Sequence, residues 1–143
     1  MRTIVARVCL AVLAAVAVSA VAAGQASIPG LDIKVTKIER AGSASLRDCP
    51  PGTNTVSAVS KPGEQFALVT VAFKVSSAYK PAPMKRPTVT DANDKSYFTP
   101  SQFVDVASVP EFSCTFPFRV PEGTKLKALK IENASFDLAG LDK

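Results

Sequence analysis

From about residue 31 onward, apolar and polar residues alternate along most of the chain, which is the period of a β-strand that buries one face. The stretch from Leu31 to Glu39 places Leu31, Ile33 and Val35 on one face, which predicts a strand whose other face is exposed. The stretch from Phe66 to Val75 is apolar on one face and partly apolar on the other, which predicts a central strand. Helical spacing is nearly absent from this part of the chain.

Further strands are predicted in the second half of the chain. Thr88 to Thr90 and Lys95 to Phe98 flank a polar segment of four residues, which predicts a hairpin. The stretch from Glu111 to Val120 alternates so that Cys114 points into the core among phenylalanines. Within it, Pro117 indicates an edge position or a bulge, because proline has no N–H to give to a neighbouring strand.

A last strand is predicted from Lys127 to Leu138. Its apolar residues change face near Asn133, after Leu129 and Ile131 and before Phe136. One extra residue in a strand produces such a change, so we expect a β-bulge at this point.

The predicted strands are joined by connections rich in turn-forming residues. The connection from Arg40 to Pro62 admits one short strand near Thr55 to Val59, and the segment from Tyr79 to Pro87 holds three prolines. Because proline removes ladder hydrogen bonds, we expect this second segment to cross between two sheets. Six to eight short strands without a helix predict an all-β domain, a two-sheet antiparallel immunoglobulin-like β-sandwich.

The first 23 residues have the three parts of a secretory signal peptide. Arg2 and Arg7 supply a basic start, an apolar run from Val8 to Val18 follows, and small residues end the segment. We expect cleavage between residues 22 and 27, which leaves a β-sandwich domain of residues 27–143. A retained membrane anchor is the alternative, but the uncharged stretch is barely long enough to span a bilayer. The sequence therefore predicts a secreted or periplasmic protein with no transmembrane segment after processing.

The charge of the chain is mildly basic. The formal net charge is +5, with 17 Lys and Arg against 12 Asp and Glu. Two of the basic residues and none of the acidic ones lie in the signal segment, so 15 basic and 12 acidic residues remain, a net charge of +3. The basic residues are spread along the chain without interleaved aromatics, so we expect no nucleic-acid partner.

The processed chain keeps two of its three cysteines, Cys49 and Cys114. Export places both in an oxidising compartment, where an even number of cysteines is expected to pair. The sequence therefore predicts a disulfide between Cys49 and Cys114, which would stabilise a core that is already large enough to fold.

The chain contains no histidine. This removes the usual general base, the Ser-His-Asp and Cys-His arrangements, and the imidazole ligands of zinc and copper sites. Asp91, Asn93 and Asp94 could form half of a calcium loop, but the fifth position is Lys95 and the twelfth is Gln102. We therefore interpret this cluster as a polar turn, and we predict a protein that is not an enzyme and uses no metal or cofactor.

Three motifs resemble a known family. They are a Pro-Gly turn that runs into a strand, an Asp-rich hairpin followed by an aromatic residue, and a late strand that ends in a proline turn: Pro62 to Phe73, Asp91 to Tyr97, and Phe116 to Pro121. Together they resemble a bacterial secreted immunoglobulin-like domain family of unknown function, telokin-like, whose structural type is a mycobacterial immunoprotective antigen. The resemblance covers roughly residues 31–138 and implies an extracellular module.

The best candidate for a function is the basic, proline-rich crossing loop. Proline stiffens the loop, and its aromatic, thioether and cationic side chains supply contact area: Tyr79, Lys80, Met84, Lys85 and Arg86. Its partner would be a protein, an anionic glycan or an anionic lipid surface, and the alternative is an ordinary polar crossover. We therefore predict a non-catalytic binding or envelope-associated module, with an accessory or inhibitor protein that docks on a secreted partner as the alternative. The oligomeric state stays open.

Overall fold

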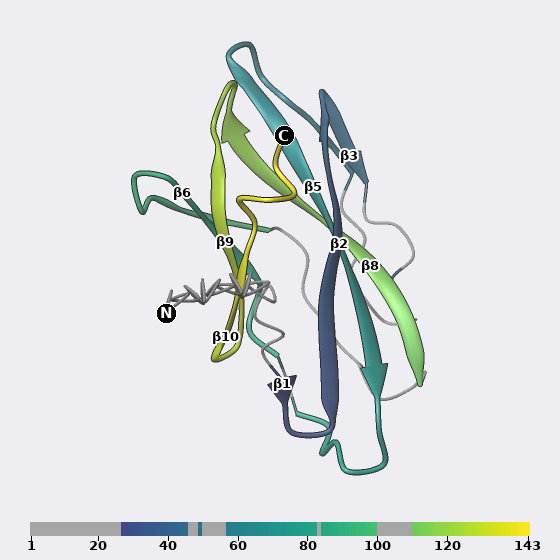
Figure 1. The fold of residues 1–143 in the computed structure, drawn as a ribbon. Coiled ribbons are helices and arrows are strands. Elements are labelled where there is room, and N and C mark those ends of the chain that lie inside the picture. Colours follow the sequence, from purple (N-terminus) through teal and green to yellow (C-terminus); the bar gives the residue numbers. More distant parts are fainter. Residues whose placement is uncertain (1–26, 46–48, 50–56, 83, 100–109) are drawn as a thin grey trace, which may run out of the picture.

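The computed structural model describes residues 27–45, 49, 57–82, 84–99 and 110–143 (Figure 1). The predicted signal peptide and its cleavage point before Ser27 lie outside these residues. The part of the chain that the structure describes forms ten β-strands and no helix, so it holds no helix that could cross a membrane. The first described strand, β1 (Ser27–Ile28), begins at the end of the predicted cleavage range.

Four antiparallel strands form sheet 1, in the order β1-β2-β5-β8. β2 begins with alternating buried and exposed residues, as the hydrophobic pattern predicts, whereas β5 and β8 each contain a run of consecutive buried residues. β5 lies between two full-length neighbours as expected of a central strand. β2 carries a bulge between Val35 and Lys37. Besides β1, the strands of this sheet are β2 (Leu31–Ala41), β5 (Glu64–Val75) and β8 (Glu111–Pro121).

Four antiparallel strands form sheet 2, in the order β10-β9-β6-β7. The predicted hairpin is β6 and β7, and a further pair, β3 and β4, forms a separate two-stranded sheet. Sheet 1 and sheet 2 lie on opposite sides of the molecule (Figure 1). The strands of sheet 2 are β6 (Thr88–Asp91), β7 (Ser96–Phe98), β9 (Leu126–Ile131) and β10 (Ala134–Asp137), and the small pair is β3 (Ser43–Ser45) and β4 (Ser57–Val59).

The main hydrophobic core fills the space between the two sheets. Val69 and Phe116 enter it from sheet 1, and Val89 and Leu129 enter it from sheet 2, and all four are fully buried. Each large apolar side chain buried in this way contributes roughly 2 kcal/mol to the free energy of unfolding. The predicted all-β antiparallel sandwich of two sheets is therefore confirmed.

A second, smaller core lies on the outer side of sheet 1. Phe66 and Leu68 of β5 point away from the main core and are buried against Ala44 of β3. The β3–β4 pair thus covers this end of the sheet, which explains why β5 is apolar on both faces. In the described part of the expected 55–59 strand, Ser57 to Val59 are extended as β4.

The prediction of a single last strand from residue 127 to 138 was wrong. The chain reverses at Glu132 and Asn133, and Ala134 of β10 pairs with Ile131 of β9. Glu132 adopts a positive φ of 50°, which lets the turn close in two residues. The apolar residues change face because the chain turns back on itself, so no bulge is needed there.

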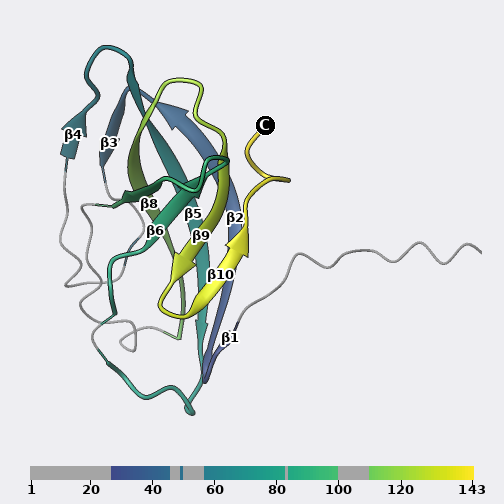
Figure 2. The ribbon, with the colours of Figure 1, turned by 90° about the vertical axis from the view of Figure 1, so that its left-hand side faces the viewer.

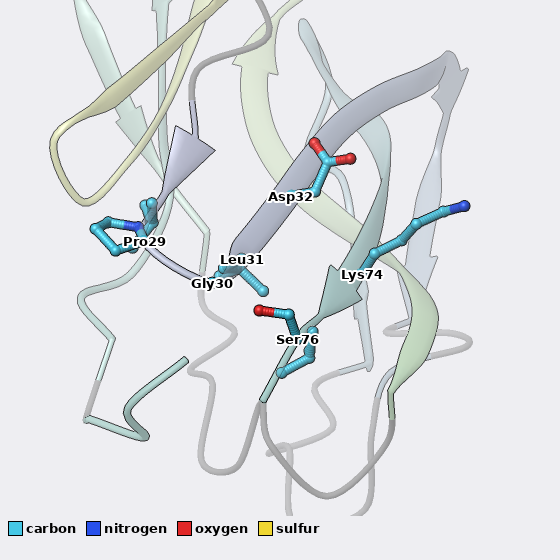
Figure 3. Close-up of a pocket in the computed structure, with 8 residues that line it drawn as sticks. Pro29, Gly30, Leu31, Asp32, Lys74 and Ser76 are labelled. Atoms are coloured by element: carbon cyan, nitrogen blue, oxygen red, sulfur yellow. The ribbon is translucent and has the colours of Figure 1, made fainter. Parts of the chain in front are cut away.

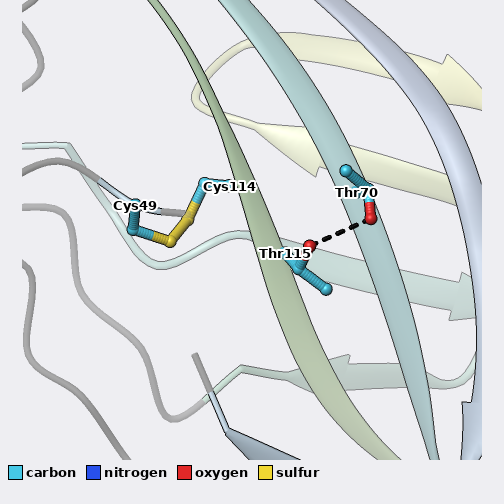
Figure 4. Close-up of a disulfide and its surroundings, with 4 residues drawn as sticks. All are labelled: Cys49, Thr70, Cys114 and Thr115. Atoms are coloured by element: carbon cyan, nitrogen blue, oxygen red, sulfur yellow. Dashed lines mark hydrogen bonds between the residues drawn. A yellow bond between two sulfur atoms is a disulfide. The ribbon is translucent and has the colours of Figure 1, made fainter. Parts of the chain in front are cut away.

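The predicted disulfide is confirmed, and it lies on the inner side of an edge strand. Cys49 and Cys114 are bonded, with their Cα atoms 4.4 Å apart. Cys114 of β8 is fully buried, and on the other side of β8 its neighbour Thr115 shares a 3.0 Å hydrogen bond with Thr70 of β5 (Figure 4). Pro117 lies on this same edge strand, as its missing N–H predicts.

A partly buried ion pair ties the C-terminal segment to both sheets. Arg40 of β2 donates from Nη2 to Asp142 Oδ1 and Oδ2 at 2.6 and 2.7 Å, and to the Thr124 carbonyl at 2.9 Å. Asp142 Oδ2 also accepts the N–H of Leu126, at the start of β9, at 2.6 Å. The Asp142 side chain is only 3% exposed. The pair therefore links sheet 1, sheet 2 and the chain end.

Candidate interaction surface

The predicted crossing loop does cross between the sheets, since it leaves β5 of sheet 1 and enters β6 of sheet 2. Its start packs tightly against the turn between β1 and β2. The N–H of Ser76 donates to the Gly30 carbonyl at 2.9 Å, and a Cβ at position 30 would lie 2.2 Å from the Tyr79 nitrogen. Gly30 also has a φ of +75°, so only glycine fits this close approach.

The five residues predicted for partner contact divide into two groups. Lys80, Lys85 and Arg86 are exposed. Met84 is only 5% exposed and belongs to the main core, so it offers no surface to a partner and that part of the prediction was wrong. The reason is that an apolar thioether fills core space next to the sheet more favourably than it faces water.

Tyr79 is partly buried and also packs against the core, so it is a supporting residue of the loop. Burial raises the pKa of its hydroxyl, and the nearby Glu132 carboxylate raises this pKa further. Glu132 Oε1 in turn accepts the backbone N–H of Lys85. The crossing loop is thus held against the turn between β9 and β10, and its cations lie beside sheet 2.

The outer side of sheet 2 extends the basic loop into a larger surface. Val89, Leu129 and Phe136 are buried in the core, so their neighbours along β6, β9 and β10 face outward. Figure 2 looks onto this side, with β6, β9 and β10 in front of sheet 1. We call it the sheet 2 outer face, and its residues are Arg86, Thr88, Thr90, Ser96, Phe98, Ala128, Lys130, Ser135 and Asp137.

One cross-strand row of this face combines a cation, two hydroxyls and an aromatic ring. Ser135 pairs with Lys130, Lys130 with Thr88, and Thr88 with Phe98. Three strand spacings separate the ends of the row, a distance of about 14 Å. Phe98 is 67% exposed, which is unusual for a large aromatic residue. Arg86 is exposed and stands two residues before Thr88, with the buried Pro87 between them.

The cations of this surface form no ion pair with the acidic residues that the structure describes. Among the described residues, Lys37, Arg40, Lys74 and Arg119 form ion pairs away from this surface, and Lys127 of β9 pairs with Asp94 in the turn between β6 and β7. The cations that form no ion pair with a described residue include those of the crossing loop and the sheet 2 outer face: Lys80, Lys85, Arg86 and Lys130. Their charge is therefore available to an anionic partner.

The Asp-rich hairpin turn is closed by its own hydrogen bonds. Asp91 Oδ1 accepts the N–H groups of Asn93 and Lys95 at 2.8 and 3.0 Å, and Oδ2 accepts the Tyr97 hydroxyl at 3.0 Å. Burial alone raises the pKa of the Asp91 carboxyl, but these three donors outweigh it and the pKa is lowered. Asp94 pairs with Lys127 at 2.7 Å. The interpretation of this cluster as a turn is confirmed, and no group of three His, Cys, Asp or Glu that could hold a metal occurs among the described residues.

A shallow hollow of about 350 Å³ lies at the end of sheet 1, beside the β1–β2 turn (Figure 3). Ile28, Pro29 and Leu31 line one side of it, and Ser76 lies opposite. The Ser76 hydroxyl already accepts the N–H of Ala78 at 3.3 Å, and Lys74 extends toward Glu111, 3.5 Å from its carboxylate. Asp32 also lines the hollow and, like Ser76 and Lys74, has an interaction within the chain, so we assign no ligand to this hollow.

Comparison with known proteins assigns no function. No family model matches the chain, and no curated protein matches it. Among solved structures, an uncharacterized β-sandwich protein from Clostridium difficile 630 is similar, with 7% sequence identity and a TM-score of 0.49. The match covers 79% of this chain and 87% of that protein. That protein is itself uncharacterized, so its name suggests no ligand or activity.

The sequence pattern located the basic loop but missed the rest of the surface. Phe98 and Lys130 were assigned to strands, and alternation alone could have placed both opposite buried neighbours. What alternation does not tell is that β7 and β9 both pair with β6, which puts the two side chains in one row. The contact of Glu132 with the loop was not predicted, because Glu132 was assigned to the interior of a strand and not to a turn.

Proposed function

We propose that this chain is a non-catalytic, extracytoplasmic binding module that attaches to an anionic component of the cell envelope through its crossing loop. The observation that carries the proposal is the group of exposed cations Lys80, Lys85 and Arg86, which lack acidic partners among the described residues. The loop is stiffened by proline and fixed at both ends, so little conformational entropy is lost when it binds.

Two further observations support this assignment. The Cys49–Cys114 disulfide favours an oxidising compartment, in agreement with the expected export signal. The chain contains no histidine, which disfavours most acid–base and metal-assisted chemistry. Membership of the bacterial secreted immunoglobulin-like family would imply the same setting, and we retain it as part of the proposal.

The proposal is tested by retention on envelope fractions. The full chain is exported from a bacterial host, purified, and mixed with isolated cell wall and with membrane vesicles at increasing salt. In one variant, Lys80, Lys85 and Arg86 are all replaced by serine. A control variant replaces three exposed lysines elsewhere, Lys34, Lys61 and Lys143, and loses the same charge.

We expect the wild-type chain to be retained in a salt-sensitive manner. The loop variant should bind at least about tenfold more weakly, since a cation near an anionic surface contributes about 1 kcal/mol, and the control variant should bind almost as well as the wild type. Equal loss in the two variants would mean that only net charge matters. Capture of one stoichiometric protein with no retention on envelope material would instead favour the accessory or inhibitor function.

A further inference from the structure

The sheet 2 outer face presents hydroxyl groups and an exposed aromatic ring in addition to its cations. Its main row begins with a hydroxyl at Ser135, continues through Lys130 and Thr88, and ends at the exposed ring of Phe98. The neighbouring row consists of Asp137, Ala128, Thr90 and Ser96. Apart from Lys130, the two central strands present short side chains on this face, which are Thr88, Thr90 and Ala128, so a long ligand can approach it closely.

We propose that the sheet 2 outer face binds a linear anionic polysaccharide, with a sugar ring against Phe98 and acidic groups of the polymer at Lys130 and Arg86. The inference rests on the proposed function, because it names the class of ligand that the adjoining crossing loop would hold. It adds a surface on the sheet itself, which the loop proposal does not require.

The chemistry of the row matches that of such a polymer. The face of a sugar ring is lined with C–H groups and packs on an aromatic ring, while its hydroxyls exchange hydrogen bonds with threonine and serine side chains. Lys130 and Arg86 provide charge-assisted hydrogen bonds to carboxylate or phosphate groups. A row of about 14 Å leaves room for a few sugar rings in sequence.

A lipid surface or a protein partner fits the same face less well. Peripheral insertion into a bilayer needs a broad apolar surface, and Phe98 is the large apolar residue that this face presents. A stable protein interface needs an apolar centre surrounded by a polar rim. Here the centre is Thr88, Thr90 and Ala128, and the aromatic ring lies at one edge of the sheet.

The acidic residues near the face are limited in number and are engaged. Glu132 accepts the N–H of Lys85, and Asp137 Oδ1 accepts the N–H of Ala139 at 2.9 Å. Both lie on the β9–β10 side, whereas Asp91 and Asp94 lie in the turn between β6 and β7, where Asp91 accepts three hydrogen bonds and Asp94 pairs with Lys127. Each of these carboxylates already accepts a hydrogen bond or forms an ion pair within the chain, which limits its repulsion of an anionic polymer at Lys130 and Arg86.

Calorimetry with defined ligands tests the inference. The exported full chain is titrated with oligogalacturonate and with hyaluronan as anionic polymers, with dextran of similar length as the neutral polymer, and with phosphatidylglycerol vesicles as the lipid surface. The variants are Lys130→Gln and Phe98→Ala. Matched controls are Lys34→Gln, an exposed lysine on sheet 1, and Val59→Ala, an apolar residue of β4 that is 73% exposed.

We expect saturable, salt-sensitive binding of at least one anionic polymer and none of dextran. Lys130→Gln and Phe98→Ala should each raise the dissociation constant about fivefold or more, whereas the two controls should leave it unchanged. All four positions are exposed, so the variants should keep the circular dichroism spectrum and urea midpoint of the wild type.

Several results would overturn the inference. Binding of vesicles but of neither polymer would do so and would leave the proposed envelope function standing. Polymer binding that is lost in the loop variant but kept in Lys130→Gln and Phe98→Ala would restrict the site to the crossing loop. Absence of binding to both anionic polymers would also exclude this ligand class, and retention on envelope fractions would then decide the proposed function separately.

Discussion

The outer faces of the two sheets are built from the same alternation of apolar and polar residues, but they differ in how far they are covered and in how their charges are paired. The sheet 1 face is covered at one end by β3 and β4, and several of its charges are paired within the chain, as in Lys74–Glu111 and Arg119–Glu64, while Lys34 forms no ion pair with a described residue. The sheet 2 face carries Lys130 without an acidic partner among the described residues, together with the exposed ring of Phe98. The covered sheet 1 face therefore contributes to the stability of the fold, and the sheet 2 face is the one to which we assign a ligand in our proposal.

The largest effect is expected from the crosslink on the inner side of sheet 1. Replacing both Cys49 and Cys114 by serine should lower the free energy of unfolding by about 4 kcal/mol, because the bond closes a loop between residues 65 positions apart. Urea unfolding measures this loss of stability, and reduction of the disulfide in the wild-type chain should lower the free energy of unfolding by the same amount. Unchanged stability in the double variant would show that the loop is already restrained by packing alone.

The contrast between the two faces is tested most directly by two phenylalanines. Phe66→Ala removes a ring buried beneath β3 and should cost about 3–4 kcal/mol. Phe98→Ala removes an exposed ring on sheet 2 and should change the free energy of unfolding by no more than about 0.5 kcal/mol. Urea denaturation measures the free energy of unfolding of both variants. Similar losses of stability in the two variants would contradict the contrast between the two faces.

The link between the sheets depends on the ion pair at the chain end. Asp142→Ala should lower the free energy of unfolding by about 3 kcal/mol, because it leaves Arg40 partly buried without its carboxylate. Replacing Arg40 and Asp142 together by leucine should cost less than the single change, since no buried charge is then left over. Glu122→Ala, at an exposed position, is the control and should have little effect in the same urea measurement.

A smaller, pH-dependent effect is expected at the hairpin of sheet 2. The pKa of Asp91 is lowered from its ordinary value of 3.8 in the folded chain. The carboxylate therefore adds stability above that value, and this contribution disappears as the pH falls through the lower folded pKa. Urea midpoints measured from pH 6 to pH 2 should fall more for the wild type than for Asp91→Asn. Parallel curves for the two proteins would contradict the role of Asp91.

Much of the fold could be predicted because alternation is a local property of the chain. Phe66 to Val75 has buried partners on both sides, and its composition already indicates a central strand. Pro117 likewise indicated the edge position of its strand, and the alternation around Cys114 indicated that its side chain points inward. The turn at Glu132 was missed because a two-residue reversal and a bulge produce the same change of face in the sequence pattern.

The candidate surface was predicted only in part. The cations of the crossing loop stand together in the sequence, so composition was enough to find them. Met84 was assigned to the same surface because it is their neighbour, whereas its burial depends on space in the core beneath the loop. The sequence around Met84 does not show whether its side chain faces water, because this depends on the core residues that pack against it in the folded chain.

The sequence by itself determined the all-β class, the inward and outward faces of the long strands, and the pairing of the last two cysteines. Each follows from side-chain alternation or from the number of cysteines outside the predicted signal peptide. Only the tertiary structure decided that Phe98 and Lys130 share a row and that Arg40 meets Asp142. Such contacts join residues far apart in the chain, and they depend on the order of strands within a sheet, which no local pattern encodes.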